Sequence, residues 1–158
     1  MENISLDNIN LTFGGGGTAE DASRRDIPQF AGEYFMLGPM PAYGLYARGV
    51  KGLTVQNVRL QYASPDLRPA VIFDHVTDAS LSGLSVQAEA STESALRFID
   101  SKDVLITAPR LLSSTETFLQ VEGADNLAIT VDGGDVTKAR QALALKNGAT
   151  TGAVRMRT

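Results

Sequence analysis

Leu45-Tyr-Ala-Arg-Gly-Val-Lys-Gly-Leu-Thr-Val-Gln-Asn-Val-Arg-Leu60 is the stretch that decides the fold, because its pattern returns 26 residues later as Val71-Ile-Phe-Asp-His-Val-Thr-Asp-Ala-Ser-Leu-Ser-Gly-Leu-Ser-Val86. The pattern begins again at Leu96, at Leu119 and, more faintly, at Leu143, in steps of 25, 23 and 24 residues. A fixed period in the twenties is typical of proteins in which each repeat stacks on the one before it. The sequence therefore predicts a repetitive, stacked architecture.

Within each repeat, apolar residues alternate with polar ones, as strands with one buried face require. Three apolar pairs per repeat predict three short strands, which in the first full repeat are Leu45/Ala47, Leu53/Val55 and Val58/Leu60. Residues that tolerate a left-handed backbone stand between these strands and predict sharp bends. We place the bends at Lys51-Gly52, Thr77-Asp78, Lys102-Asp103 and Asp125-Asn126 at one corner, and at Asp7-Asn8, Gln56-Asn57 and Ser82-Gly83 at the next.

Three architectures have repeats of this kind, and only one fits. Leucine-rich repeats need a Leu-x-x-Leu-x-Leu consensus that is absent here, and a β-sandwich would not keep three strands per repeat in register over four copies. We therefore predict an all-β fold, a right-handed parallel β-helix of about five coils that forms one domain over residues 1–158. After Val131 the repeat weakens, and we expect a short helical detour over residues 136–141.

One long insertion interrupts the coils. Residues 4–11 match residues 53–60, so the chain starts partway round a coil, and the spacing of 49 residues leaves room for an insertion that we place at residues 13–43. Its four glycines at 14–17 lack the features of a phosphate loop and are interpreted as a hinge. The insertion is rich in aromatic residues, which is typical of binding loops on a regular scaffold. Alternatively, Phe30, Phe35 and Met36 hold the loop against the coil.

The composition narrows the range of ligands. The chain has 14 basic and 18 acidic residues, so it has no overall field that attracts nucleic acid or anionic membranes, and we expect neither as a partner. It has no cysteine and one histidine, which argues against thiolate or zinc sites, and we expect no metal and no cofactor. No apolar run is long enough to cross a bilayer, and the first residues lack the pattern of a signal peptide.

The outward positions of the first strand in each repeat define one surface. Stacked strands present side chains about every 4.8 Å along the axis, which suits an extended polymer such as a polysaccharide. The same mixture of residues is equally typical of any sheet face in water. The outward residues are Tyr46, Arg48, Ile72, Asp74, Arg97, Ile99, Gln120, Glu122, Ala144 and Lys146.

Paired carboxylates are the residues that glycoside hydrolysis needs. Asp74 and Glu122 lie two coils apart on the outward face, roughly 10 Å by the strand spacing, and Glu93 and Glu116 precede strands in successive coils. Solvated loop carboxylates are the alternative interpretation of both pairs. His75, directly after a predicted strand, is interpreted as a turn residue rather than as a general base.

With the coils placed, the chain resembles the C-terminal part of pectin-lyase-like β-helix proteins, in particular bacterial members of glycoside hydrolase family 28, the polygalacturonases and rhamnogalacturonases. The resemblance covers nearly the whole chain. The stretches that carry it are Phe35-Met-Leu-Gly-Pro-Met-Pro-Ala-Tyr-Gly-Leu-Tyr-Ala-Arg48, Val50-Lys-Gly-Leu-Thr-Val-Gln-Asn-Val-Arg-Leu60 and Asp66-Leu-Arg-Pro-Ala70. It implies a periplasmic or secreted protein with an acidic plant polysaccharide as its partner.

The catalytic motifs of that family are Asn-Thr-Asp, Asp-Asp, Gly-His-Gly and Arg-Ile-Lys, and none is complete here. The last is echoed only by Leu96-Arg97-Phe98-Ile99, in which Ile99 replaces the lysine. We therefore expect no catalytic residue in this chain. The positions that match Asp-Asp hold Ala42-Tyr43, Arg68-Pro69, Glu93-Ser94, Glu116-Thr117 and Arg140-Gln141.

Three functions remain open. The chain is a structural or substrate-groove part of a pectin-degrading β-helix, a binding module for acidic polysaccharides, or a small glycosidase that uses a carboxylate pair. Tyrosine rings would stack on sugars and arginines would meet uronic carboxylates. The candidate substrate-binding residues are Arg24, Arg25, Tyr34, Tyr43, Tyr46, Arg48 and Arg97.

The start partway round a coil also has a structural consequence. It leaves strand edges and apolar interior exposed at the N-terminal end, which natural proteins cover. We therefore expect either a homo-oligomer or preceding coils to cap this end.

Overall fold

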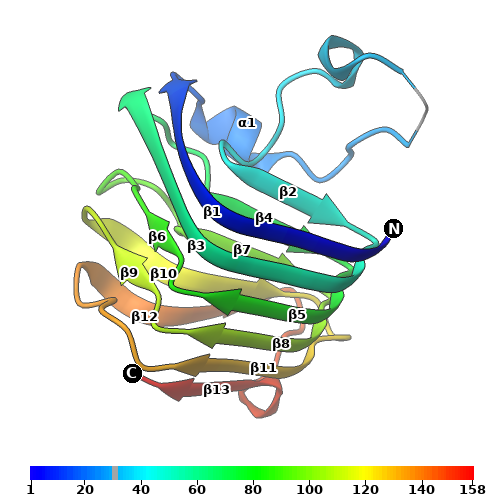
Figure 1. Cartoon of the computed structure of the whole chain (residues 1–158), viewed down its shortest axis with the longest axis vertical. Helices are drawn as coiled ribbons and strands as arrows, with labels where there is room; N and C mark the ends of the chain where they lie inside the picture. The colour runs from blue at the N-terminus through cyan, green and yellow to red at the C-terminus, as the bar shows by residue number, and fades with distance from the viewer. Residues whose placement is uncertain (30–31) are drawn as a thin grey trace.

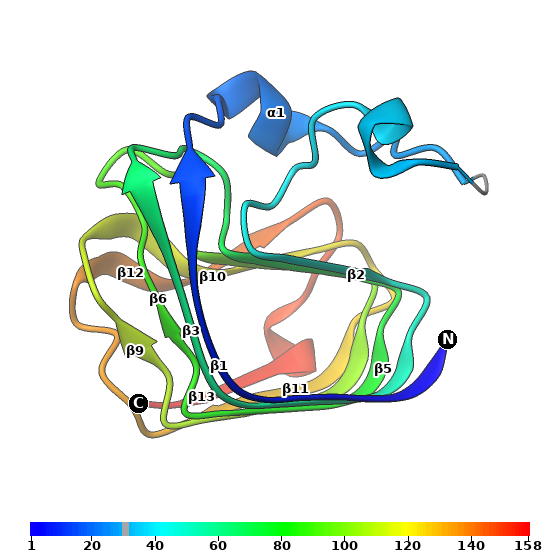
Figure 2. The ribbon, with the colours of Figure 1, turned by 45° about the horizontal axis from the view of Figure 1, so that its top comes forward.

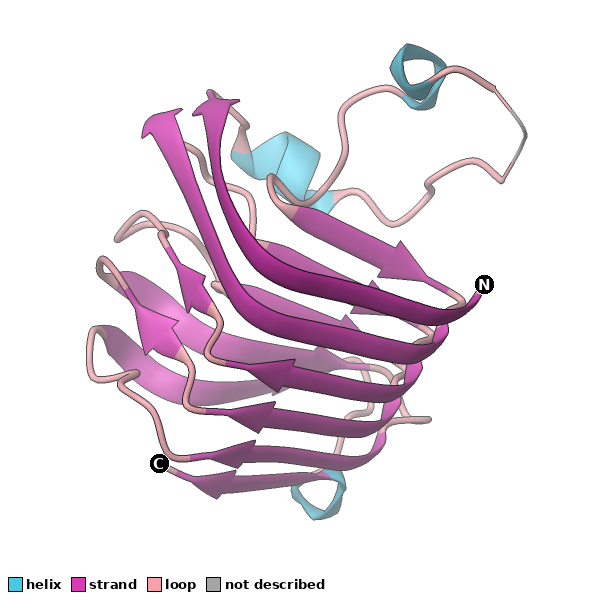
Figure 3. Cartoon of the chain, viewed as in Figure 1, coloured by secondary structure: helices cyan, strands magenta, loops and turns pink. Residues whose placement is uncertain are grey.

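The computed structural model describes residues 1–29 and 32–158. It confirms a right-handed parallel β-helix of about five coils with very little helix (Figure 1, Figure 3). Five- and eight-stranded parallel sheets enclose one apolar core, and each strand pairs with its equivalent in a neighbouring coil. No helix in the described ranges is long and apolar enough to cross a membrane.

The five-stranded sheet has the order β12-β10-β7-β4-β2. Leu45 pairs with Val71, Val71 with Leu96, Leu96 with Leu119, and Leu119 with Leu143, which confirms each step of the predicted repeat. The strands are β2 (Leu45–Arg48), β4 (Val71–Asp74), β7 (Leu96–Ile99), β10 (Thr115–Glu122) and β12 (Ala139–Lys146).

The eight-stranded sheet folds into two arms that form the other sides of the coil (Figure 2). The long strand β3 belongs to both arms, because its first half pairs with β5 and its second half with β6. β1 pairs with β3 from Glu2 to Gly15, as the match between residues 4–11 and 53–60 predicts. The strands are β1 (Glu2–Gly15), β3 (Lys51–Ser64), β5 (Thr77–Ser82), β6 (Ser85–Val86), β8 (Lys102–Thr107), β9 (Arg110–Leu111), β11 (Leu127–Asp132) and β13 (Val154–Arg157).

The coil turns at columns of residues with a left-handed backbone, whose φ angles lie between 44° and 94°. Most of the predicted bends are confirmed, but in the fourth coil Ala128 takes the place that we assigned to Asp125-Asn126. Asn126 is instead buried and accepts a hydrogen bond from the Ser101 main-chain N–H at 2.9 Å. The columns are Asn3/Gly52/Asp78/Asp103/Ala128, Asn8/Asn57/Gly83/Ala108/Gly133 and Gly49/His75/Asp100/Gly123/Asn147.

The inward residues pack in columns along the axis. Phe73 and Phe98 occupy equivalent positions in neighbouring coils, and their rings stack with centroids 4.8 Å apart. Both are fully buried, so each coil covers the apolar face of the next. The expected helical detour is wrong, because residues 136–138 form a turn closed by Thr137 and Asp135 and the strand starts at Ala139.

The insertion leaves β1 and lies along the outer side of the five-stranded sheet (Figure 2). It contains α1 (Ala19–Ser23), which Thr18 and Asp21 close with a capping box, and the short 3-10 helix η1 (Tyr34–Leu37). Phe35 and Met36 are 75% and 55% exposed, so they do not hold the loop against the coil, and Phe30 lies outside the described residues.

Candidate functional site

The outward face of the five-stranded sheet is covered instead of open to water. Ile72, Arg97 and Gln120 point away from the core and yet are at most 1% exposed. The insertion lies across these residues and buries its own Ala22 and Ile27. The predicted groove is therefore not open, because a segment of the same chain covers it. We call this covering segment, residues 22–27, the roof.

Guanidinium groups fix this roof to the sheet. Arg97 of β7 donates from Nη1 to the Ala22 carbonyl at 2.6 Å, and Arg48 of β2 donates from Nη1 to the Ile27 carbonyl at 2.8 Å. In the opposite direction, Arg25 of the insertion reaches Glu122 of β10. Main-chain carbonyls, which have no partner in a strand ladder here, are satisfied by these charged donors.

Glu122 is the acidic centre of one half of the site. Both of its oxygens accept from Arg25, at 2.8 and 3.1 Å, Arg97 Nε lies 3.3 Å from Oε1, and Gln120 donates to the same oxygen. Burial opposes ionisation of Glu122, but the hydrogen bonds from Arg25 and Gln120 and the two positive charges outweigh it and lower its pKa. Glu122 is therefore a carboxylate at neutral pH.

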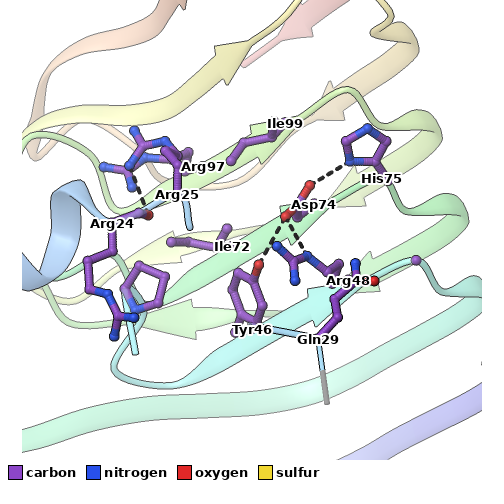
Figure 4. A pocket seen from close by; sticks show the side chains of 12 residues that line it. Arg24, Arg25, Gln29, Tyr46, Arg48, Ile72, Asp74, His75, Arg97 and Ile99 are labelled. Atoms are coloured by element: carbon purple, nitrogen blue, oxygen red, sulfur yellow. Dashed lines mark hydrogen bonds and ion pairs between the residues drawn. The ribbon is translucent and has the colours of Figure 1, made fainter. Parts of the chain in front are cut away.

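Arg97 is a fully buried cation. Its Nη2 contacts Glu93 at 3.3 Å, whereas its Nε makes no hydrogen bond despite the nearby Glu122. Burial lowers the pKa of Arg97, and the adjacent Arg25 guanidinium lowers it further. The carboxylates of Glu122 and Glu93 act in the opposite direction but do not outweigh these two effects. Two guanidinium groups thus lie side by side over the sheet (Figure 4).

Asp74 is the acidic centre of the other half. Its Oδ2 accepts from Tyr46 at 2.9 Å and from Arg48 Nε at 3.1 Å, and its Oδ1 lies 2.6 Å from His75 Nδ1 (Figure 4). Burial opposes ionisation, but these donors outweigh it and lower the pKa of Asp74. Burial and the bond to Asp74 raise the pKa of Tyr46 to about 12, so the hydroxyl stays a donor.

A cavity of about 440 Å³ lies between the roof and the sheet, next to these clusters. Five of the seven predicted substrate-binding residues line it: Arg24, Arg25, Tyr46, Arg48 and Arg97. The other lining residues are Gln29, Pro41, Gly49, Ile72, Asp74, His75 and Ile99 (Figure 4).

The sixth predicted residue, Tyr43, is not brought to this cavity. Tyr43 lies in the core at 4% exposure, where its ring contacts Phe13 and Tyr62 edge-on and its hydroxyl donates to main-chain carbonyls. No face of the Tyr43 ring is therefore open to a sugar. Tyr34 begins η1, and its side chain lies outside the described structure.

His75 is the lining residue whose role sequence reasoning missed. Its φ of 55° agrees with a turn residue, but its ring also lines the cavity and contacts Asp74. The available signal was its position directly after Asp74, an outward residue of the same strand. A corner residue next to an outward carboxylate lies at the rim of the sheet face.

Three of the four carboxylates in the proposed pairs lack the raised pKa that the general acid of glycoside hydrolysis needs. Asp74 and Glu122 are bound by arginines, and Glu116 contacts Arg140 at 3.3 Å. The pKa of Glu93 is also lowered, because Lys146 and Arg97 outweigh its burial. A general acid needs a raised pKa, so Asp74, Glu93 and Glu122 are suited to hold cations rather than to donate protons.

Within residues 1–29 and 32–158, no group of three or more histidine or acidic side chains is placed to hold a metal ion. Comparison of the chain with protein-family models, with curated proteins and with solved structures finds no match. The resemblance to glycoside hydrolase family 28 therefore stays a prediction, whereas the β-helix itself is established by the strand pairing.

Proposed function

We propose that this β-helix binds an acidic saccharide in the cavity under the insertion and has no catalytic residues of its own. The observation that carries the proposal is the convergence of Arg24, Arg25 and Arg48 on one cavity, in front of the buried Arg97; among the described residues Asp74 is the single acidic one that lines it. Planar guanidinium groups match carboxylates in a two-pronged geometry. A uronic acid presents such a carboxylate on a compact ring.

Arg24 supports this proposal because its charge is not balanced by a buried acid. It donates to the main-chain carbonyls of Leu37 and Pro39, and its acidic contact is Asp26, 3.8 Å away and 89% exposed. The side chains of Arg24 and Arg25 are 23% and 40% exposed, so both are partly accessible to a ligand. The charge at the insertion side of the cavity therefore favours an anion.

The other wall supplies the contacts that a sugar ring needs. Tyr46 offers a half-buried aromatic ring, and Gln29 and His75 offer polar groups. The volume of about 440 Å³ lies within the range of small-ligand sites. These features suit one or two sugar units held by their carboxylates rather than a long polymer along the sheet.

The proposed binding site also agrees with a second function, that of a substrate-groove part of a pectin-degrading β-helix. The segment 35–48, which carries the family resemblance, ends in β2 and delivers Tyr46 and Arg48 to the cavity. We propose that the chain serves as the ligand-binding part of a pectin-processing system.

Isothermal titration with oligogalacturonides tests the proposal. We expect saturable binding, at least tenfold stronger than to neutral oligogalactosides, and a loss of at least tenfold in Arg24→Ala and Arg48→Ala. Lys102→Ala, an exposed residue of β8, is the matched control and is expected to bind like the wild type. No heat at millimolar oligogalacturonide, or equal binding of the neutral sugars, overturns the proposal.

A further inference from the structure

The first and last strands of the described β-helix each have an unpaired edge. In the described part of the chain, β1 pairs with β3 alone and β13 with β11 alone, so each has one free backbone edge. At the N-terminal end, Leu11 is 45% exposed, and the inward residues of β1 are only partly buried. At the C-terminal end, inward residues of β12 and β13 are likewise only partly buried. A free edge beside exposed apolar interior is a pairing surface.

The two strands that would meet, β1 and β13, carry opposite charge. β1 contains Glu2 and Asp7 and no basic residue, whereas β13 contains Arg155 and Arg157 and no acidic residue. Contact between two N-terminal ends would bring carboxylates together, and contact between two C-terminal ends would bring cations together. Only unlike ends attract each other.

We propose that a second copy of this chain docks head-to-tail, with the free edge of β13 in one copy pairing in parallel with the free edge of β1 in the next. The register follows from the columns. Ile4 and Val154 are equivalent, because each aligns with Leu53, Ala79, Val104 and Ile129 along the arm. Continuing that column across the junction places Val154 on Ile4, Arg155 on Ser5, Met156 on Leu6 and Arg157 on Asp7.

This register is complementary at three of its four positions. Ile4 and Leu6 would meet Val154 and Met156, so apolar residues of the interior rows cover each other. Arg157, which lies 3.9 Å from Asp132 in its own copy, would lie between two carboxylates. The insertion lies outside the five-stranded sheet and leaves the open end clear (Figure 2). A one-residue slip would place polar residues over apolar ones.

The contact is small, because the coil that begins with β1 has no strand in the five-stranded sheet. Association is therefore weak, rises with protein concentration and weakens with salt, which screens the Asp7–Arg157 attraction. A head-to-tail contact uses two different surfaces, so it produces open chains of copies instead of closed dimers.

Cysteine cross-linking tests the register, because the chain has no cysteine of its own. Ser5→Cys and Arg155→Cys are made as separate single variants, mixed at high concentration and oxidised. We expect dimers in the mixture and monomers for either variant alone, and a ladder of trimers and longer species for the double variant. Thr54→Cys with Arg155→Cys is the matched control and is expected to stay monomeric, because Thr54 lies one rung inside the end.

Sedimentation velocity supplies the second measurement. The average mass of the wild type is expected to rise with concentration, Asp7→Lys and Arg157→Asp are each expected to abolish this rise, and combining the two changes is expected to restore it. A wild type that stays monomeric at the highest concentration, or a Ser5→Cys variant that forms dimers by itself, overturns the proposal.

Discussion

The two outward faces of the β-helix differ although they belong to the same coils. Arg97 in the five-stranded sheet is fully buried, whereas Leu105, a few residues later on the outward face of the adjacent arm, is 43% exposed. Both positions alternate with core residues in the same way. The difference is the insertion, which covers one face and not the other (Figure 2). The strand pattern determines where a side chain points, and a segment outside the repeat determines whether it is buried.

Arg97→Ala is the strongest test of this difference. It leaves Glu122 with one arginine and removes a donor from the Ala22 carbonyl, so we expect a loss of about 3–5 kcal/mol in the free energy of unfolding. Leu105→Ala, on the uncovered face, is expected to change it by less than about 0.5 kcal/mol. Urea denaturation measures both. Equal losses in the two variants would show that the faces do not differ.

Acid is expected to weaken the contacts of the covered face. The pKa values of Asp74, Glu93 and Glu122 are lower in the folded chain than in the unfolded one, so the unfolded chain binds more protons as the pH falls. Their stabilisation is complete above the unfolded pKa values, about 4, and is lost as the pH falls through the folded values. Glu122→Gln is expected to flatten the decline in unfolding free energy below that pH. If the decline is equally steep in the variant, Glu122 does not contribute to this pH dependence.

Arg25→Ala tests the same attachment from the insertion, whereas Arg97→Ala tests it from the sheet. It removes both hydrogen bonds from the insertion to Glu122, and the partial exposure of the arginine limits the expected loss to about 1–2 kcal/mol. Lys102→Ala on the exposed arm is the matched control, with an expected change within about 0.5 kcal/mol. Thermal denaturation compares the two variants. If Arg25→Ala loses no more stability than the control, Arg25 does not fix the insertion.

The smallest expected effect concerns a bend in the arm that the insertion leaves uncovered. Ala128 has a φ of 54°, a conformation that costs an alanine about 1–2 kcal/mol and a glycine little. After the larger backbone entropy of glycine is subtracted, Ala128→Gly is expected to stabilise the fold by about 0.5–1 kcal/mol. Val131→Ala, in the same strand and fully buried, is expected to do the opposite. Destabilisation by Ala128→Gly would mean that this bend is not strained.

The register of the coils was predictable because it depends on columns of single residues. Leu45, Val71 and Leu96 repeat in both composition and spacing, and a slip by one residue would turn every side chain to the wrong face. The bends at Asn57 and Gly83 were predictable for the same reason, since those residues tolerate a left-handed backbone.

The roof over the sheet was not predictable, because it has no counterpart in the repeat. Its polar contacts join Arg97 to a main-chain carbonyl of the insertion, and a carbonyl leaves no signal in the sequence. Tyr43 was assigned to the site because it is aromatic and near the insertion, but its ring is buried in the core. Ala128 was missed as a bend because alanine rarely has that backbone conformation.

Limited proteolysis tests the central claim, that residues 22–27 are fixed on the outward face of the sheet while Phe35 of η1 is exposed. Arg24 and Arg25 lie in the fixed segment, and Phe35 is 75% exposed. We expect trypsin to leave the bonds after Arg24 and Arg25 intact in the wild type and to cut them in Arg97→Ala, whereas chymotrypsin cuts after Phe35 in both. Rapid tryptic cleavage after Arg25 in the folded wild type would contradict this claim.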